Sequence, residues 1–124
     1  MTLTVREYNA FCGGLSGAHF VEQWGGAQVW KVGGKVFAIA WFEAGQAPQI
    51  TFKVSEIGWE VLREAEGCRP APYMASRGLK WIQSHAKPGL SKAELRQYLK
   101  ASYQMVREAL PKRVRAALDE QDAE

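Results

Sequence analysis

The sequence VWKVGGKVFA, residues 29–38, places the pair Gly33-Gly34 between two β-prone segments. Both central residues of a type I′ turn need a positive φ, which glycine adopts without steric cost. These residues therefore predict a β-hairpin. A second pair, Gly25-Gly26, predicts another hairpin directly before it. Strands are accordingly expected at residues 18–24, 28–32 and 35–43.

A fourth strand is predicted at residues 49–54, which alternate between apolar and polar side chains. Ile50, Phe52 and Val54 would face one side of the sheet, and the polar residues between them would face the other. Such alternation is typical of an antiparallel sheet with one packed face and one wetter face.

Two helices are predicted beside these strands. Residues 4–13 have apolar side chains at helical spacing and end at a glycine pair. Ser55 can cap a second helix that runs to about Glu66. Its buried face is expected to consist of Ile57, Val61, Leu62 and Ala65.

The clearest helical signal lies near the end of the chain. Ser91 and Glu94 form a capping box, and apolar residues follow at helical spacing up to Pro111. Pro111 breaks or restarts the helix, and the last residues should fray. Before this helix we expect an irregular loop at residues 67–78 and a short strand at 79–84. The predicted order is α-β-β-β-β-α-β-α, an α+β fold in which helices cover one face of an antiparallel sheet.

Length and composition fit one compact domain. The chain has 124 residues, of which 47% are apolar and 23% charged, as in an ordinary globular protein. We assign residues 1–118 to a single domain and 119–124 to an acidic tail. The longest apolar run, residues 36–42, is far shorter than the ~20 residues of a membrane span, and no signal-peptide pattern is present. Cys12 and Cys68 are interpreted as buried thiols in a reducing cytoplasm.

Positive charge is concentrated in the second half of the chain. Residues 1–66 hold five Lys or Arg and seven Asp or Glu, whereas residues 67–115 hold eleven Lys or Arg and two Asp or Glu. Four further acids follow from Asp119 onward. Segregation of this kind indicates an anionic partner more strongly than the net charge of +3 does.

Six motifs resemble those of the MmcQ/YjbR family, and the hairpin at residues 29–38 is the first of them. The others follow in the family's order: Phe52-Lys53-Val54, Arg69-Pro70-Ala71-Pro72-Tyr73, Trp81-Ile82, Ser102-Tyr103 and Leu110-Pro111-Lys112-Arg113. The resemblance extends from about Gly17 to Val114. It implies a fold similar to CyaY, the bacterial frataxin, and a place among proteins described as double-wing DNA-binding proteins. Val36 stands where family members usually have Met, a conservative change.

The sequence offers no assembled catalytic or metal-binding motif. Gly34-Lys35 lacks the remaining residues of a phosphate-binding loop. His19 and His85 have no His or Cys partner at ligand spacing. Frataxin binds iron through an acidic ridge on its first helix, where this chain has only Glu7, so the resemblance does not imply iron binding. We therefore expect a non-enzymatic protein without a metal or cofactor.

Eight basic residues are the candidate contacts to an anion: Lys31, Lys35, Lys53, Arg77, Lys80, Lys92, Arg96 and Lys100. The last three recur at i, i+4 and i+8 of the long helix, and no acid compensates them on the same stripe. Two interpretations stay open, a solvated basic face and an anion-binding surface. For Lys53, a phosphate contact and a side chain lying along the sheet are equally open.

Aromatic and hydroxyl side chains also have two interpretations. Trp30, next to Lys31 and close to a hairpin tip, is the tryptophan best suited to stack on a base, whereas the others are expected in the core. Ser102 and Tyr103 lie on the apolar face of the long helix. We expect them to bond to the sheet or to the loop of residues 70–73, together with Tyr73, in preference to forming a catalytic pair.

These observations together predict a nucleic-acid-binding protein that is not an enzyme. DNA is favoured over RNA, with the glycine hairpins as wings and the basic helix and loop as phosphate contacts. Because phosphate contacts carry no sequence information, weak specificity is expected. The protein is expected to be a cytoplasmic monomer or weak dimer with no membrane contact. The alternative is a protein-binding or small-ligand module without a nucleic-acid role.

Overall fold

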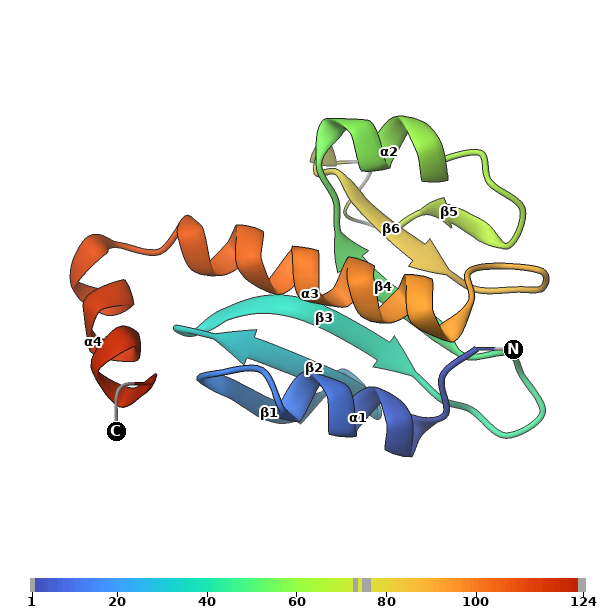
Figure 1. Cartoon of the computed structure of the whole chain (residues 1–124). Coiled ribbons are helices and arrows are strands. Elements are labelled where there is room, and N and C mark those ends of the chain that lie inside the picture. Colours follow the sequence, from blue (N-terminus) through green and yellow to red (C-terminus); the bar gives the residue numbers. More distant parts are fainter. Residues whose placement is uncertain (1, 73, 75–76, 123–124) are drawn as a thin grey trace.

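The computed structural model describes residues 2–72, 74 and 77–122 (Figure 1). Within them, six strands form one antiparallel sheet in the order β1-β2-β3-β4-β6-β5, accompanied by four helices. The helices are α1 (Val5–Gly13), α2 (Glu56–Leu62), α3 (Lys92–Glu108) and α4 (Lys112–Asp122). The strands are β1 (Ala18–Gln23), β2 (Ala27–Val32), β3 (Lys35–Trp41), β4 (Gln49–Lys53), β5 (Cys68–Pro70) and β6 (Trp81–Ser84). The α+β class and the order of the predicted elements are confirmed.

Both glycine hairpins are present, and they point in opposite directions (Figure 1). Gly33 and Gly34 have φ values of 57° and 80°, as the β2–β3 turn requires. The β1–β2 turn begins one residue earlier than expected, because Trp24 also adopts a positive φ of 48°. Six residues of β2 separate the two tips, roughly 20 Å at about 3.3 Å per residue. The two turns therefore lie at opposite ends of the sheet.

Helices α1 and α3 cover one face of the sheet and enclose the main core. Tyr8 of α1, Phe37 of β3, Phe52 of β4 and Leu99 of α3 are all fully buried there. Two capping boxes begin these helices, as predicted for α3. The packed face expected from the alternation in β4 is thus confirmed.

A β-bulge at Phe37 changes which residues of β3 face the helices. The pairing moves from Trp30 opposite Ala38 to Lys31 opposite Val36, so Phe37 has no partner across β2. Phe37 and Ala38 consequently both reach the main core, and the Phe37 carbonyl oxygen accepts a hydrogen bond of 2.6 Å from Ser102 Oγ.

The opposite face of the sheet is only partly exposed to solvent. Val29 and Ile39 are buried there, and Trp41 and Met74 pack against them in a second, smaller apolar cluster. Met74 belongs to the segment that follows β5. The loop that was expected at residues 67–78 therefore contains a sheet strand, β5, and part of the cover of this face.

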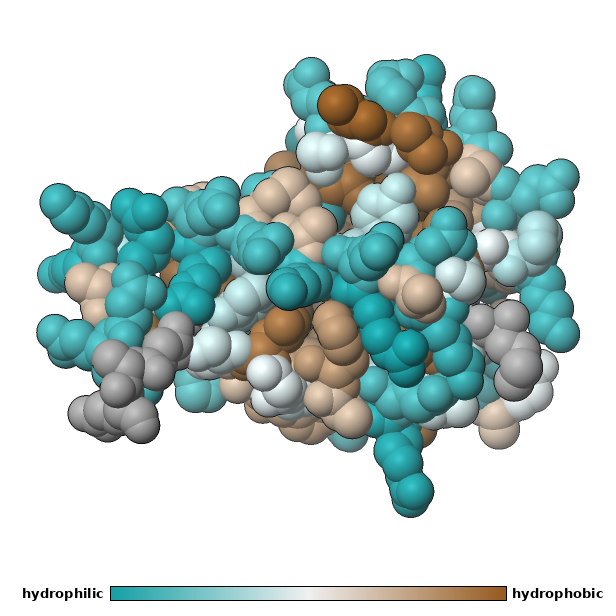
Figure 2. All heavy atoms as spheres, viewed as in Figure 1, coloured by the Kyte–Doolittle hydropathy of each residue, from teal (hydrophilic) through white to brown (hydrophobic). Residues whose placement is uncertain are grey.

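Helix α2 is shorter than predicted and presents a different face. It ends at Leu62 and buries Gly58 and Leu62. Ile57 and Val61, predicted to be buried, are 79% and 59% exposed. Figure 2 shows apolar surface in the region of α2. The reason is close approach: a Cβ on Gly58 would lie 3.1 Å from the Cβ of Val54, so the helix packs through its smallest residue.

Pro111 restarts the helix, and α4 continues to Asp122. Leu118 is 8% exposed and lies against Gly17, where an added Cβ would come within 2.7 Å of a Leu118 methyl carbon. This contact holds the last helix on the domain. Most of the predicted acidic tail is therefore helical, and residues 123–124 lie outside the described residues.

Candidate nucleic-acid interface

The eight predicted basic contacts do not form one patch. They fall into groups in different parts of the fold: Lys92 and Arg96 beside α1, Lys80 and Arg77 before β6, Lys35 and Lys53 at the C-terminal end of α3, Lys31 on β2, and Lys100 in the middle of α3. The groups differ in whether a carboxylate lies close to their side-chain nitrogen atoms.

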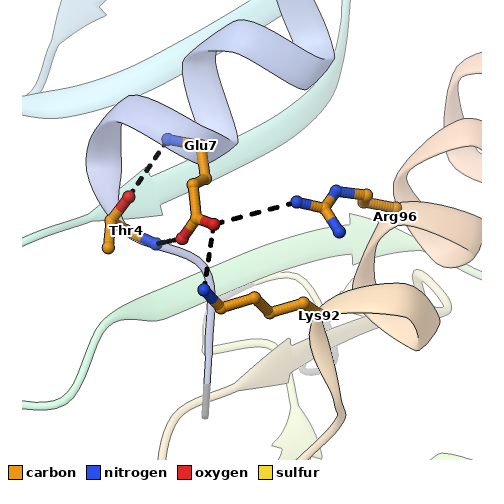
Figure 3. A network of polar contacts seen from close by, with 4 residues as sticks. All are labelled: Thr4, Glu7, Lys92 and Arg96. Atoms are coloured by element: carbon orange, nitrogen blue, oxygen red, sulfur yellow. Dashed lines mark hydrogen bonds and ion pairs between the residues drawn. The ribbon is translucent and has the colours of Figure 1, made fainter.

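Lys92 and Arg96 share an acidic partner on another helix (Figure 3). Glu7 Oε2 lies 2.9 Å from Lys92 Nζ and 3.9 Å from Arg96 Nη2. The compensating acid thus comes from α1 and not from the stripe on α3, where none was expected. Glu7 lies 85 residues before Lys92, so helical spacing alone could not identify it.

Glu7 is held as a carboxylate by its own capping box. The Thr4 backbone N–H donates to Glu7 Oε1 at 3.0 Å, and Lys92 Nζ donates to the other oxygen. The backbone hydrogen bond from Thr4, followed by that from Lys92, lowers the pKa of Glu7 from 4.5 to about 2. Because Glu7 is ionised at neutral pH, it cancels part of the positive charge at this end of α3.

Lys80 also has an acidic partner. Its ammonium lies 3.3 Å from Glu56 Oε1, in an exposed pair. Arg77, three residues earlier, is exposed. An exposed pair of this kind is worth about 0–1 kcal/mol and is easily opened, so Lys80 is a weaker candidate contact than a lysine without a carboxylate beside it.

Lys35 and Lys53 line one cleft of about 270 Å³. The cleft lies between the end of the sheet and the C-terminus of α3, and Trp81, Leu110 and Pro111 contribute to its walls. Among the described residues, no carboxylate oxygen lies within 4.0 Å of either ammonium nitrogen. Of the predicted residues, this pair is the one that the structure brings together with both charges uncompensated.

The strand order explains how these two lysines meet. Strand β4 runs antiparallel to β3, so the end of β4 lies beside the start of β3. Ser102 Oγ accepts a 2.9 Å hydrogen bond from the Lys53 backbone N–H and thereby fixes β4 against α3. The turn before Lys35 packs under Leu110 at Gly33, where an added Cβ would lie 2.5 Å from a Leu110 methyl carbon.

Helix α4 adds two basic residues to the eight candidate contacts, and one of them, Arg115, was expected from the sequence to extend the basic set. Lys112 and Arg115 line the cleft next to the Lys35 and Lys53 cleft, along with Glu108 and Asp119. Asp119 is engaged by Arg107 at 2.9 Å. The signal in the sequence is the basic run after Pro111, and its position in the fold depends on the packing of α4 against the domain. We refer to Lys35, Lys53, Lys112 and Arg115 as the basic end.

The remaining two predicted contacts do not line the Lys35 and Lys53 cleft, although Lys31 pairs with Val36 of β3, which does. Lys31 is directly opposite His19 across the β1–β2 pair. Lys100 is exposed in the middle of α3. Neither lines the cleft that holds Lys35 and Lys53.

Trp30 is not available for base stacking. It is only 9% exposed, its ring packs against Phe20, and its indole N–H donates to Asn9 Oδ1 at 2.8 Å. Of the two interpretations of Trp30, core packing is therefore the one that holds, because Asn9 of α1 satisfies the indole inside the domain. The expected core position is wrong for Trp24, which lies in the β1–β2 turn and is the exposed tryptophan among the described residues, at 60%.

The two hydroxyls of α3 make internal hydrogen bonds, and the expected bond to the sheet is confirmed for Ser102. Ser102 is fully buried and bridges β3 and β4. Tyr103 OH donates to the Ser16 carbonyl oxygen at 2.5 Å and accepts from Arg107 Nη1 at 2.9 Å. These partners lie in neither the sheet nor the loop of residues 70–73, so the expectation is wrong for Tyr103. Tyr73, predicted to join this network, lies outside the described residues.

Both cysteines are buried free thiols. Burial raises the pKa of the Cys12 thiol and also that of Cys68, to which the charge of Glu94 adds. Such thiols are poor nucleophiles at neutral pH. In the described part of the chain, no three His, Cys, Asp or Glu side chains gather to hold a metal ion, and no helix is long and apolar enough to cross a membrane.

The fold and the cleft define an α+β domain with one helix-covered, six-stranded antiparallel sheet and a basic end. The YjbR family model matches residues 13–105, so the chain belongs to the YjbR family. This confirms the resemblance drawn from the six motifs. No curated protein matches the chain in sequence.

Two solved structures share the fold. A Deinococcus radiodurans protein with a DUF419 domain is 20% identical, with a TM-score of 0.79 over 94% of this chain and 88% of that one. A Pseudomonas syringae protein is 17% identical, with a TM-score of 0.66 over 84% of this chain and 99% of that one. Identities this low establish likeness of fold alone.

Proposed function

We propose that this protein is a non-enzymatic nucleic-acid-binding protein that holds the phosphate backbone at its basic end. The observation that carries the proposal is the cleft shared by Lys35 and Lys53, whose ammonium groups have no carboxylate within 4.0 Å in the described part of the chain. Two like charges facing one cleft are complementary to an anion. Lys112 and Arg115 extend the same charge onto the neighbouring surface.

The contacts are of the kind that position a backbone and do not read bases. Lysine ammonium groups bind phosphate as point charges, and phosphate contacts give affinity without sequence information. We therefore propose weak sequence specificity, with duplex DNA as the preferred form. The buried thiols and the structural hydrogen bonds of Ser102 support a non-enzymatic role.

The two glycine hairpins act separately in this proposal. The β2–β3 turn lies beside the basic end and places Lys35 there. The β1–β2 turn lies at the other end of β2 and takes no part in the same contact. One hairpin, not two, therefore serves as a wing on the bound backbone.

A titration tests the proposal directly. Fluorescence anisotropy of a mixed-sequence duplex should show binding at about 50 mM salt and a loss of about 100-fold in affinity at about 200 mM, as expected for four neutralised phosphates. A duplex of unrelated sequence should bind equally well. Reversing Lys35 and Lys53 to Glu should abolish binding while the protein stays folded, since both side chains are in part solvent-exposed.

The result that overturns the proposal is the absence of duplex and single-strand binding at about 50 mM salt, where phosphate contacts are strong. It would favour the alternative, a protein-binding or small-ligand module. Binding that survives the double reversal would also contradict the proposal, because it would place the contact on another surface.

A further inference from the structure

A pocket of about 310 Å³ lies on the face of the sheet opposite α1 and α3. Its floor follows one row of neighbouring strand residues, in which Arg69 of β5 pairs with Gln83 of β6, Gln83 with Thr51 of β4, and Thr51 with Ile39 of β3. The row is polar at one end and apolar at the other. The volume lies at the lower end of the range for pockets that bind small molecules.

The polar half of the floor is a chain of fixed hydrogen bonds. Arg69 Nε and Nη2 donate to Gln83 Oε1 at 2.9 and 2.7 Å, and Gln83 Nε2 donates to Thr51 Oγ1 at 3.1 Å. Gln83 and Thr51 are 2% and 3% exposed. Because the amide oxygen of Gln83 receives both donors, the guanidinium plane of Arg69 is held in one orientation.

Arg69 still has donors to offer. Its Nη1 group has no acceptor, and no carboxylate lies within 4.0 Å of the guanidinium, in the part of the chain that the structure describes. Arginine stays charged at any physiological pH. A fixed, half-buried guanidinium with free N–H groups is a ready partner for a carboxylate, which it binds through charge-assisted hydrogen bonds.

The walls of the pocket are mostly apolar. Ile39, Trp41, Ala71, Pro72 and Met74 line it. Glu43 also lines it, without a cation within 4.0 Å among the described residues. A carboxylate at this position repels a ligand that carries several negative charges, so the pocket favours a single one.

We propose that this pocket binds a small organic monocarboxylate with an aromatic or branched apolar body. The carboxylate meets the free donors of Arg69, and the body lies on Trp41, Ile39 and Met74. Gln83 is the positioning residue that orients Arg69. This site is independent of the basic end, because the residues that line the two clefts do not overlap.

The test uses isotope-labelled full-length protein and 3-phenylpropanoate as the probe. Amide shifts of Thr51 and Gln83 and the indole shift of Trp41 should titrate with a Kd of about 0.1–5 mM, as expected for a ligand of this size. The neutral isostere 3-phenylpropanamide should bind about tenfold more weakly, since it lacks the charge that strengthens these hydrogen bonds. Inorganic phosphate should leave these resonances unchanged.

A matched pair of variants locates the contact. Arg69→Gln should weaken the binding of 3-phenylpropanoate by about tenfold. Lys31→Gln removes the same charge from a strand residue outside the pocket and should not change this affinity. Arg69→Gln should leave duplex binding unchanged, and reversal of Lys35 and Lys53 should leave carboxylate binding unchanged. Equal affinity for the carboxylate and its amide in the native protein, or the absence of any shift at these residues, would overturn the proposal.

Discussion

Glu7 on α1 and Lys92 on α3 form a 2.9 Å ion pair between residues that lie 85 positions apart. The pair joins the N-terminal ends of two helices that cover the same face of the sheet (Figure 3). The pair also neutralises the charge of Lys92, which is then less available to bind an anion. The candidate interface therefore lies at the other end of α3, where Lys35 and Lys53 have no such partner among the described residues.

The first prediction concerns acid stability. The pKa of Glu7 is lowered to about 2 in the folded protein, below its ordinary value of 4.5. The stability that its ionisation contributes is therefore complete above pH 4.5 and is lost as the pH falls toward 2. Glu7→Gln should lower Tm at neutral pH and flatten the fall of Tm over this range. Thermal unfolding followed by circular dichroism measures both curves, and parallel curves for the two proteins would refute the assignment.

A second prediction concerns Ser102, which joins α3 to two strands. Ser102→Ala should lower the free energy of unfolding by about 1–3 kcal/mol, because the Phe37 carbonyl and the Lys53 N–H lose their buried partner. Gln104→Ala, an exposed change on the same helix, is the control and should have little effect. Urea unfolding gives both values. A loss of duplex binding by folded Ser102→Ala with unchanged stability would assign the hydroxyl a functional role instead.

The β2–β3 turn provides a matched pair of substitutions. Gly33→Ala and Gly34→Ala both place a side chain at positive φ, which costs about 1–2 kcal/mol. Only the first adds a Cβ that meets Leu110, at 2.5 Å, whereas nothing lies within 4 Å of a Cβ at Gly34. The free energy of unfolding of Gly33→Ala should therefore be lower than that of Gly34→Ala by about 1–3 kcal/mol. Equal denaturation midpoints would show that Leu110 does not pack on this turn.

Trp24 should be replaceable with a gain in stability. Its φ of 48° is strained for a bulky residue, and its side chain is 60% exposed. Trp24→Gly should raise the free energy of unfolding by about 1 kcal/mol, since glycine adopts this conformation freely. Duplex affinity should stay the same, because Trp24 lies at the end of β2 away from the basic end. A drop in affinity would assign this turn to the interface.

The sequence predicted those parts of the fold that local rules control. Gly33-Gly34 determines a turn through its positive φ, and Ser91 with Glu94 determines the start of α3, because each depends on neighbouring residues alone. The buried face of helix α2 was not predicted correctly, because its orientation depends on the close approach of Gly58 to Val54. The spacing of apolar residues does not reveal this contact.

The site was harder to predict because it depends on contacts between distant segments. The partner of Lys92 comes from α1, and the cleft of Lys35 and Lys53 needs the pairing of β3 with β4. The pocket at Arg69 requires that β6 lie between β4 and β5. No spacing within a single element reveals that order.

The salt dependence of duplex binding tests the central claim most directly. The affinity for duplex DNA is measured over a range of salt concentrations for three proteins. They are the native protein, the double variant Lys35→Gln with Lys53→Gln, and the double variant Lys92→Gln with Arg96→Gln. Each double variant removes two charges. If the basic end holds the backbone, the first double variant should make the slope of log affinity against log salt shallower by about 1.8, or about 0.9 for each lost phosphate contact. The second should change it by less than half as much, since Glu7 already neutralises part of that pair. Equal changes in the two slopes, or a larger change for Lys92 and Arg96, would contradict the account.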